Sequence, residues 1–166
     1  AEHSDLVQCI LISKNKNIIE QTKNEIFTQL KKIPRSLIAK KSLINYGILL
    51  NVNSDKKIIE IINKIGPEHL ELNIKNYKSY IPQIKSSGSV CLGKYAVMSM
   101  TDMGAPGSNH VLPTNMSSKY SSGLNVSEFI KKISYITLTK LGIDKIGPSA
   151  IRLAKFEGLE AHAKSI

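Results

Sequence analysis

The chain has 166 residues, a formal net charge of +10 and 42% hydrophobic residues, a composition typical of a soluble globular domain. No apolar run approaches the roughly 18 residues that a membrane-spanning helix needs, and the polar opening AEHSDLVQ is unlike a secretory signal. The positive charge comes mostly from lysines scattered along expected helices, with only Arg35 and Arg152 as arginines. We therefore expect no specific nucleic-acid partner and no membrane partner.

The first part of the chain predicts strands that alternate with helices. Short runs rich in Ile, Leu and Val predict buried strands at 8–13, 47–52, 69–74 and 88–93. Apolar periodicity and capping residues predict helices at 17–33, 35–46, 54–65 and about 76–85. This alternation favours an α/β fold, a partial Rossmann-like layer with a mainly parallel sheet, followed by a helical C-terminal arm.

Helix boundaries follow from polar and breaking residues. Asn17 is the expected cap of the first helix, and Ser54 or Asp55 that of the third. Gly66 and Pro67 end the third helix. Its apolar stripe is expected to consist of Ile58, Ile61, Ile62 and Ile65.

The segment 94–123 has no period and is rich in Gly, Ser, Pro and Met, so we expect an irregular and functional stretch. Residues 127–140 predict a helix or short strand, and a final helix is expected from about Ser149. The predicted domains are an α/β half-domain over 1–115 and a mostly helical arm over 116–166. Two cysteines at positions 9 and 91 lie in apolar strand-like runs, which indicates free thiols in a reducing compartment.

The stretch GPEHLEL places an acid, Glu68, directly before a base, His69. Neighbouring side chains of a strand point to opposite faces, but Pro67 places this pair at the start of one, where both can share a site. A histidine suits general-base chemistry and a neighbouring carboxylate can activate water. From the residues alone, a strand start that happens to be polar is the favoured explanation of the pair.

The other histidines and one carboxylate of the irregular segment are candidate metal ligands, namely His3, Asp102, His110 and His162. Imidazole and carboxylate suit zinc. Their large separations in sequence, however, are no evidence for a shared site.

Four motifs together carry a resemblance to a known family. GPEHLEL, GSNHVLPT, SSGLNVSEFIKK and EGLEAHA occur in the order and rough spacing of histidinol dehydrogenase, and the resemblance covers residues 1–166. The chain resembles the C-terminal part of such enzymes. The resemblance implies cytoplasmic, homodimeric, zinc-dependent oxidation of L-histidinol to L-histidine through an aldehyde, with NAD as hydride acceptor.

The resemblance also implies roles for individual residues. His69 is similar to the base that deprotonates the alcohol, and Glu68 to the residue that activates water for attack on the aldehyde. His3, Asp102 and His162 match three zinc ligands, and AEHSD resembles the end of the family's Gln-x-x-His metal-binding turn. The implied substrate-binding residues are His69, Asp102, His110, Glu157 and His162.

In the family, the C-terminal arm brings a Glu and a His into the partner's active site, which implies that 116–166 serves dimerisation. Glu157 and His162 are separated by about 140° on an ideal helix, since each residue turns it by about 100°. Both reach one site only if the helix ends between them, which Gly158 permits.

The chain departs from the family pattern in several ways. It holds no Gly-rich dinucleotide loop, so we expect no NAD-binding residues in it and no turnover by the chain alone. The Gln of the metal-binding turn would precede Ala1, Met98 stands where the family usually has Glu, and one extra residue separates Asp102 from His110. Three interpretations stay open: part of a working dehydrogenase, a decayed or split relic kept as a non-catalytic interaction module, and an enzyme for another small alcohol.

Overall fold

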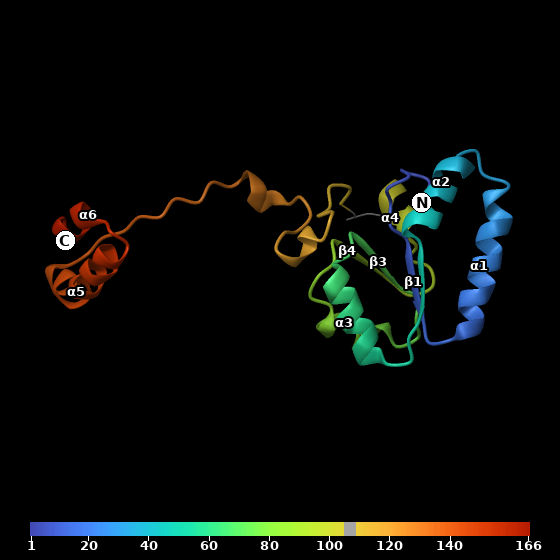
Figure 1. The fold of residues 1–166 in the computed structure, drawn as a ribbon, viewed down its shortest axis with the longest axis horizontal. Helices are drawn as coiled ribbons and strands as arrows, with labels where there is room; N and C mark the ends of the chain where they lie inside the picture. The colour runs from blue at the N-terminus through green and yellow to red at the C-terminus, as the bar shows by residue number, and fades with distance from the viewer. Residues whose placement is uncertain (105–108) are drawn as a thin grey trace. The chain divides into compact units, whose positions relative to one another are not determined.

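The computed structural model describes residues 1–104 and 109–166, and it divides the chain into two units, Ala1–Asn125 and Val126–Ile166. The sequence predicts a boundary after residue 115. The first unit contains, in order, β1 (Ile10–Ser13), α1 (Lys16–Leu30), α2 (Ser36–Tyr46), β2 (Ile48–Asn51), α3 (Asp55–Ile65), β3 (His69–Leu72), β4 (Ser89–Leu92) and α4 (Met98–Met103) (Figure 1). The second unit contains α5 (Lys140–Phe156) and α6 (Glu160–Lys164).

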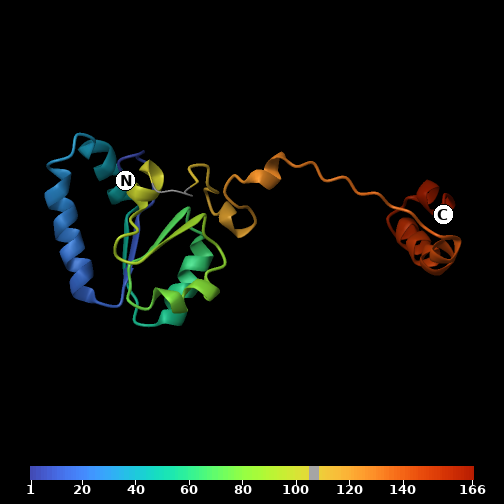
Figure 2. The same ribbon diagram turned by 180° about the vertical axis from the view of Figure 1, so that it is seen from behind.

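The strands form two parallel pairs, which confirms the mixed α/β class and the parallel pairing. β1 pairs with β2 from Ile10↔Ile48 onward, and β3 pairs with β4 from His69↔Ser89 onward. α1 packs against β1, β2 and α2, and Figure 2 shows this group from behind. The Rossmann-like layer stays a prediction.

α3 supplies most of the hydrophobic core. The Ser54 hydroxyl accepts a hydrogen bond from the Lys57 amide at 3.4 Å, and Gly66 ends the helix with φ of 58°, as the sequence predicts. The buried core consists of Ile58, Ile59, Ile62, Leu72 and Tyr80. Ile59, which the predicted stripe omits, is therefore core, while Ile61 and Ile65 are only half-buried.

Two predictions about the first unit are wrong in detail. Asn15, not Asn17, caps α1: the Asn15 side chain accepts from the Asn17 amide at 2.9 Å, and the helix ends at Leu30. The expected helix at 76–85 is instead two 3₁₀ turns, Tyr77–Ser79 and Ile81–Gln83. Pro82 lies in the second turn, where its missing N–H and its ring disfavour a continuous α-helix.

The segment 94–123 is not irregular throughout, because it contains α4 and a 3₁₀ turn at Ser117–Lys119. Its residues 105–108 lie outside the described part of the chain. Residues 130–139, all described, form neither helix nor strand, which corrects the expectation for 127–140. α5 starts at Lys140 rather than near Ser149, because the Thr139 hydroxyl caps it by accepting from the Gly142 amide at 3.1 Å.

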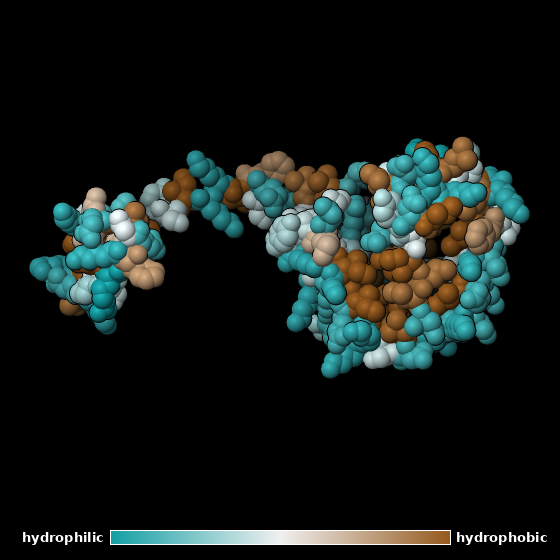
Figure 3. All heavy atoms as spheres, viewed as in Figure 1, coloured by the Kyte–Doolittle hydropathy of each residue, from teal (hydrophilic) through white to brown (hydrophobic). Residues whose placement is uncertain are grey.

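Apolar side chains gather on the visible face of the first unit (Figure 3). The strands contribute partly exposed large apolar residues, namely Ile48, Leu49, Val90 and Leu92. Among the described residues, no helix combines the length and the apolar character needed to cross a membrane.

Candidate active site

His69 is the first residue of β3, and its ring is held by the neighbouring strand. Parallel pairing places Ser89 opposite His69, and the His69 Nδ1 lies 3.0 Å from the Ser89 Oγ. The other ring nitrogen, Nε2, lies 3.7 Å from Glu68 Oε1 and 3.8 Å from Asp102 Oδ1. One imidazole nitrogen is thus engaged by a hydroxyl, while the other faces two carboxylates.

The backbone of Glu68 is fixed although its side chain stays accessible. The Ser89 amide donates to the Glu68 carbonyl at 2.8 Å, and the Gly88 amide donates to the Pro67 carbonyl at 2.9 Å. A Cβ at Gly88 would lie 2.6 Å from the Glu68 carbonyl oxygen, so only glycine fits this approach. The Glu68 side chain is 42% exposed, which leaves its carboxylate open to water.

Asp102 comes to this site from α4, an element absent from the sequence prediction. Its side chain is only 9% exposed, compared with 22% for His69. The structure therefore brings together Glu68, His69 and Asp102, although Glu68 and Asp102 are 34 positions apart in the sequence.

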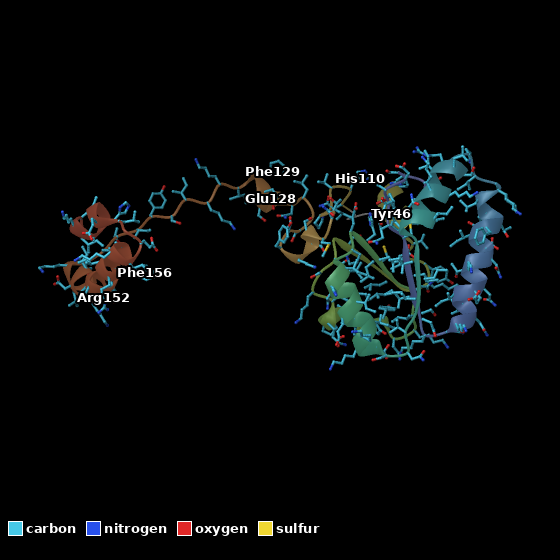
Figure 4. The ribbon with its side chains drawn as sticks, in the orientation of Figure 1. Tyr46, His110, Glu128, Phe129, Arg152 and Phe156 are labelled. Carbon is cyan, nitrogen blue, oxygen red and sulfur yellow. The ribbon has the colours of Figure 1, made fainter. Side chains whose placement is uncertain are left out.

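The two other candidate histidines of the first unit, His3 and His110, have no hydrogen bond or ion pair with His69 in the described structure. His3 is exposed near the N-terminus, and its carbonyl accepts from the Arg35 guanidinium at 3.3 Å. His110 is exposed on the loop of the first unit labelled in Figure 4. Within 1–104 and 109–166, no three His, Cys, Asp or Glu side chains form a group that could hold a metal ion.

The second unit contains a helix break between Glu157 and His162, which both residues need if they are to reach one site. α5 ends at Phe156, Gly158 has φ of 77°, and α6 begins at Glu160. Glu157, the C-cap residue of α5, and His162, within α6, are both exposed and therefore lie on the two sides of this break rather than on opposite sides of one helix.

The loop 109–124 comes close to Gly66, at the start of GPEHLEL, and to Gly88, just before β4. Its ends are joined, because the Leu124 amide donates to the Val111 carbonyl at 3.0 Å. Pro113 Cδ lies 3.1 Å from the position that a Cβ would take at Gly88, and Ser118 Oγ lies 2.8 Å from that position at Gly66. Pro113 of GSNHVLPT thus lies close to Gly88, whose amide is bonded to the backbone of GPEHLEL, and Ser118 lies close to Gly66 of GPEHLEL itself.

Sequence reasoning missed two polar neighbours of this site. Ser89 holds the His69 ring, and the Glu71 carboxylate accepts from the Met98 amide at the start of α4 at 2.6 Å. The strand register, with His69 opposite Ser89, would have indicated the first contact. No local pattern indicates the second, which joins residues 27 positions apart.

Comparison with known proteins gives consistent matches. The family model described as histidinol dehydrogenase matches residues 1–166. Curated histidinol dehydrogenases from Pelagibacter ubique, Listeria monocytogenes and Methanocaldococcus jannaschii are 62%, 43% and 40% identical over 166 residues. The crystal structure of histidinol dehydrogenase from Elizabethkingia anophelis superimposes with a TM-score of 0.76 at 39% identity.

These matches cover the chain almost completely but only part of each relative. All of the chain aligns with 39% of the Pelagibacter ubique and Listeria monocytogenes proteins, and 99% of it aligns with 38% of the Elizabethkingia anophelis structure. The chain thus spans about two fifths of the length of the relatives that it matches.

Proposed function

The chain belongs to the histidinol dehydrogenase family, and from this premise we propose that it supplies the proton-transfer site of an enzyme that oxidises L-histidinol to L-histidine. The observation that carries the proposal is the His69 imidazole, held by Ser89 on one nitrogen and flanked by Glu68 and Asp102 at the other. Such a ring is oriented for general-base catalysis.

In the first oxidation, His69 Nε2 accepts the proton of the substrate hydroxyl. The tautomer required donates its Nδ1–H to the Ser89 Oγ, which leaves the Nε2 lone pair free. Loss of the proton and of a hydride from the same alcohol converts it to the aldehyde. The carboxylates of Glu68 and Asp102 stabilise the imidazolium that forms.

In the second oxidation, Glu68 takes a proton from water as the water oxygen attacks the aldehyde carbon. Its exposed carboxylate is the group at this site that water reaches most readily. The hydrated aldehyde is left as a monoanion by the proton that Glu68 took, and it then loses a second hydride. His69, after returning its first proton to solvent, accepts the remaining hydroxyl proton, so that the product is a carboxylate. One water is consumed and two hydrides leave over the two steps.

The proposed zinc donors are His3, Asp102 and His162, whose imidazole and carboxylate groups are of the type zinc prefers. The described residues do not assemble three such donors, so this assignment rests on donor chemistry and family. Bound zinc would hold the substrate by its nitrogens, and NAD, bound by polypeptide other than this chain, would accept the hydrides. We further propose that His110 and Glu157 contact the substrate and that the enzyme is a cytoplasmic homodimer.

A chimera tests this proposal. The matching segment of the Pelagibacter ubique enzyme, 62% identical over 166 residues, is replaced by this chain, and NADH formation from L-histidinol is followed by absorbance. We expect turnover, with one zinc per chain by elemental analysis. His69→Gln in the chimera should lower kcat by about 10²-fold or more through loss of the base, while Glu68→Gln should slow only the aldehyde step.

The aldehyde is supplied directly to separate the two steps. Glu68→Gln should then lose oxidation of the aldehyde and keep oxidation of the alcohol. A folded chimera without turnover would contradict the proposal and favour the relic, and turnover with a different small alcohol only would favour another substrate.

A further inference from the structure

We infer that Glu71 is a positioning residue: its carboxylate anchors the N-terminus of α4 to β3 and thereby holds Asp102 beside His69. Neither the residue type of Glu71 nor a sequence motif indicates this role. Its functional meaning rests on the proposed function, but the contact that carries it is the 2.6 Å hydrogen bond from the Met98 amide to Glu71 Oε1.

One face of the β3–β4 pair carries all the groups involved. His69 and Glu71 alternate with Leu70 and Leu72 along β3, so that they point to one side while Leu72 enters the core on the other. Parallel register places Ser89 opposite His69 and Cys91 opposite Glu71. This face therefore carries the polar side chains of His69, Glu71 and Ser89 beside the buried Cys91, and we call it the polar face; the opposite face is apolar.

α4 lies against this polar face through three contacts. The Met98 amide meets Glu71 at 2.6 Å, Thr101 Oγ1 lies 4.0 Å from Cys91 Sγ, and Asp102 Oδ1 lies 3.8 Å from His69 Nε2. The start of α4 is thus near the end of β3, and the end of α4 is near its start. The helix and the strand run in opposite directions.

The spacing of the two polar contacts fits this arrangement. Met98 and Asp102 are four residues apart on one side of α4, a rise of about 6 Å. Glu71 and His69 are two residues apart on β3, a distance of about 6.6 Å. Because the two lengths nearly match, fixing Met98 over Glu71 places Asp102 over His69.

α4 also needs an external cap. It has six residues, too few for a stable helix by itself, and its N-cap residue, Val97, has no polar side chain to accept from the free amides. A carboxylate at a helix N-terminus satisfies a free amide and interacts favourably with the helix dipole. Glu71 supplies this group from the neighbouring strand.

The test uses the isotopically labelled 166-residue chain and three variants. Glu71→Ala removes the acceptor, Glu71→Gln keeps an acceptor oxygen without the charge, and Glu60→Ala removes an exposed carboxylate of α3 that pairs with Lys57 at 3.1 Å. Amide hydrogen exchange reports the stability of α4. The change in the His69 ring-proton signal caused by Asp102→Asn, at fixed pH, reports whether the two side chains are adjacent.

We expect Glu71→Ala to speed exchange of the α4 amides about tenfold, with Glu71→Gln intermediate and Glu60→Ala unchanged. Asp102→Asn should shift the His69 signal in the parent and in Glu71→Gln, but less than half as far in Glu71→Ala. Unchanged α4 exchange, an unchanged His69 response, or equally faster exchange throughout the first unit in Glu71→Ala would each overturn the inference.

The kinetics of the active chimera provide an independent test of the positioning role. There Glu71→Ala should lower kcat about tenfold with a smaller effect on KM, since a misplaced site slows chemistry more than binding, and Glu71→Gln should recover most of the loss. An inactive parent chimera with the expected exchange result would refute the proposed function and leave the positioning role standing. An active chimera indifferent to Glu71→Ala would refute the positioning role alone.

Discussion

The hydroxyl of Tyr80 connects three parts of the first unit. It donates a hydrogen bond to Asp55 Oδ1 at the start of α3. Asp55 Oδ1 in turn lies 2.6 Å from the ammonium nitrogen of Lys14, the residue that follows β1. Hydrogen bonds from Lys14 and from Tyr80 lower the pKa of Asp55 below its usual value. Burial, followed by the hydrogen bond to Asp55, raises the pKa of Tyr80 to about 12.

Tyr80→Phe should therefore have a pH-dependent effect on stability. Because the folded-state pKa of Tyr80 lies above its ordinary value of 10.0, its contribution is complete below pH 10.0 and is lost as the pH rises through about 12. Because the pKa of Asp55 is lowered, the contribution of Asp55 is present above its ordinary 3.8 and is lost as the pH falls through its folded-state pKa. We expect a loss of about 1 kcal/mol near neutral pH, measured by urea unfolding.

The control for this experiment is Tyr120→Phe, because Tyr120 is 84% exposed. Its unfolding free energy should differ little from that of the parent at any pH. A Tyr80→Phe difference that stays constant from acid to alkaline pH would show that the loss comes from packing rather than from the hydrogen bond.

Among the elements, α3 is joined to residues 83–86, just before β4, by the side-chain amide of Asn63. The Asn63 Nδ2 donates to the Gln83 carbonyl at 2.8 Å, while its Oδ1 accepts from the Lys85 amide at 2.7 Å and the Ser86 amide at 3.3 Å. These bonds satisfy backbone groups of a segment that has no strand partner of its own.

Asn63→Ala should lower the free energy of unfolding by about 2 kcal/mol, because three hydrogen bonds are lost. Asn63→Asp keeps the acceptor for Lys85 and Ser86 and loses only the donor to Gln83, so about half of that cost is expected. Urea unfolding of both variants measures the difference. Equal losses in the two variants would mean that the accepted hydrogen bonds contribute nothing.

The elements that the sequence predicts well are those whose signals are local. α3 combines a serine cap, an apolar face and a terminal glycine, and each signal lies within or next to the helix. α4 has no such local signal, because the group that caps it is the Glu71 carboxylate on β3. α5 extends through Pro148, which as an isolated signal indicates a helix start. The earlier cap at Thr139 outweighs it.

At the scale of the whole molecule, the same distinction separates the predictable part of the site from the rest. The adjacent pair Glu68 and His69 is visible in the sequence, and a turn before β3 brings the two side chains within 3.7 Å. Ser89 and Asp102 join them only through strand register and helix docking. Their residue types alone carry no information about such contacts, because parallel pairing links distant segments.

Global opening of the first unit can be followed through its two free thiols. Cys91 is 3% exposed on the strand face covered by α4, whereas Cys9 is half-buried just before β1. A thiol reagent must reach the sulfur, so Cys9 should react quickly and Cys91 only when the unit opens. We expect their rates with an aromatic disulfide to differ by about 10³-fold or more at neutral pH.

The single variants assign the two phases. Cys9→Ser should leave only the slow reaction, and Cys91→Ser only the fast one. Urea should accelerate the slow reaction until both thiols react alike, because unfolding removes the protection of Cys91. Rapid reaction of Cys91 in the absence of urea would show that α4 leaves the sheet face easily, in which case Asp102 would also spend much of its time away from His69.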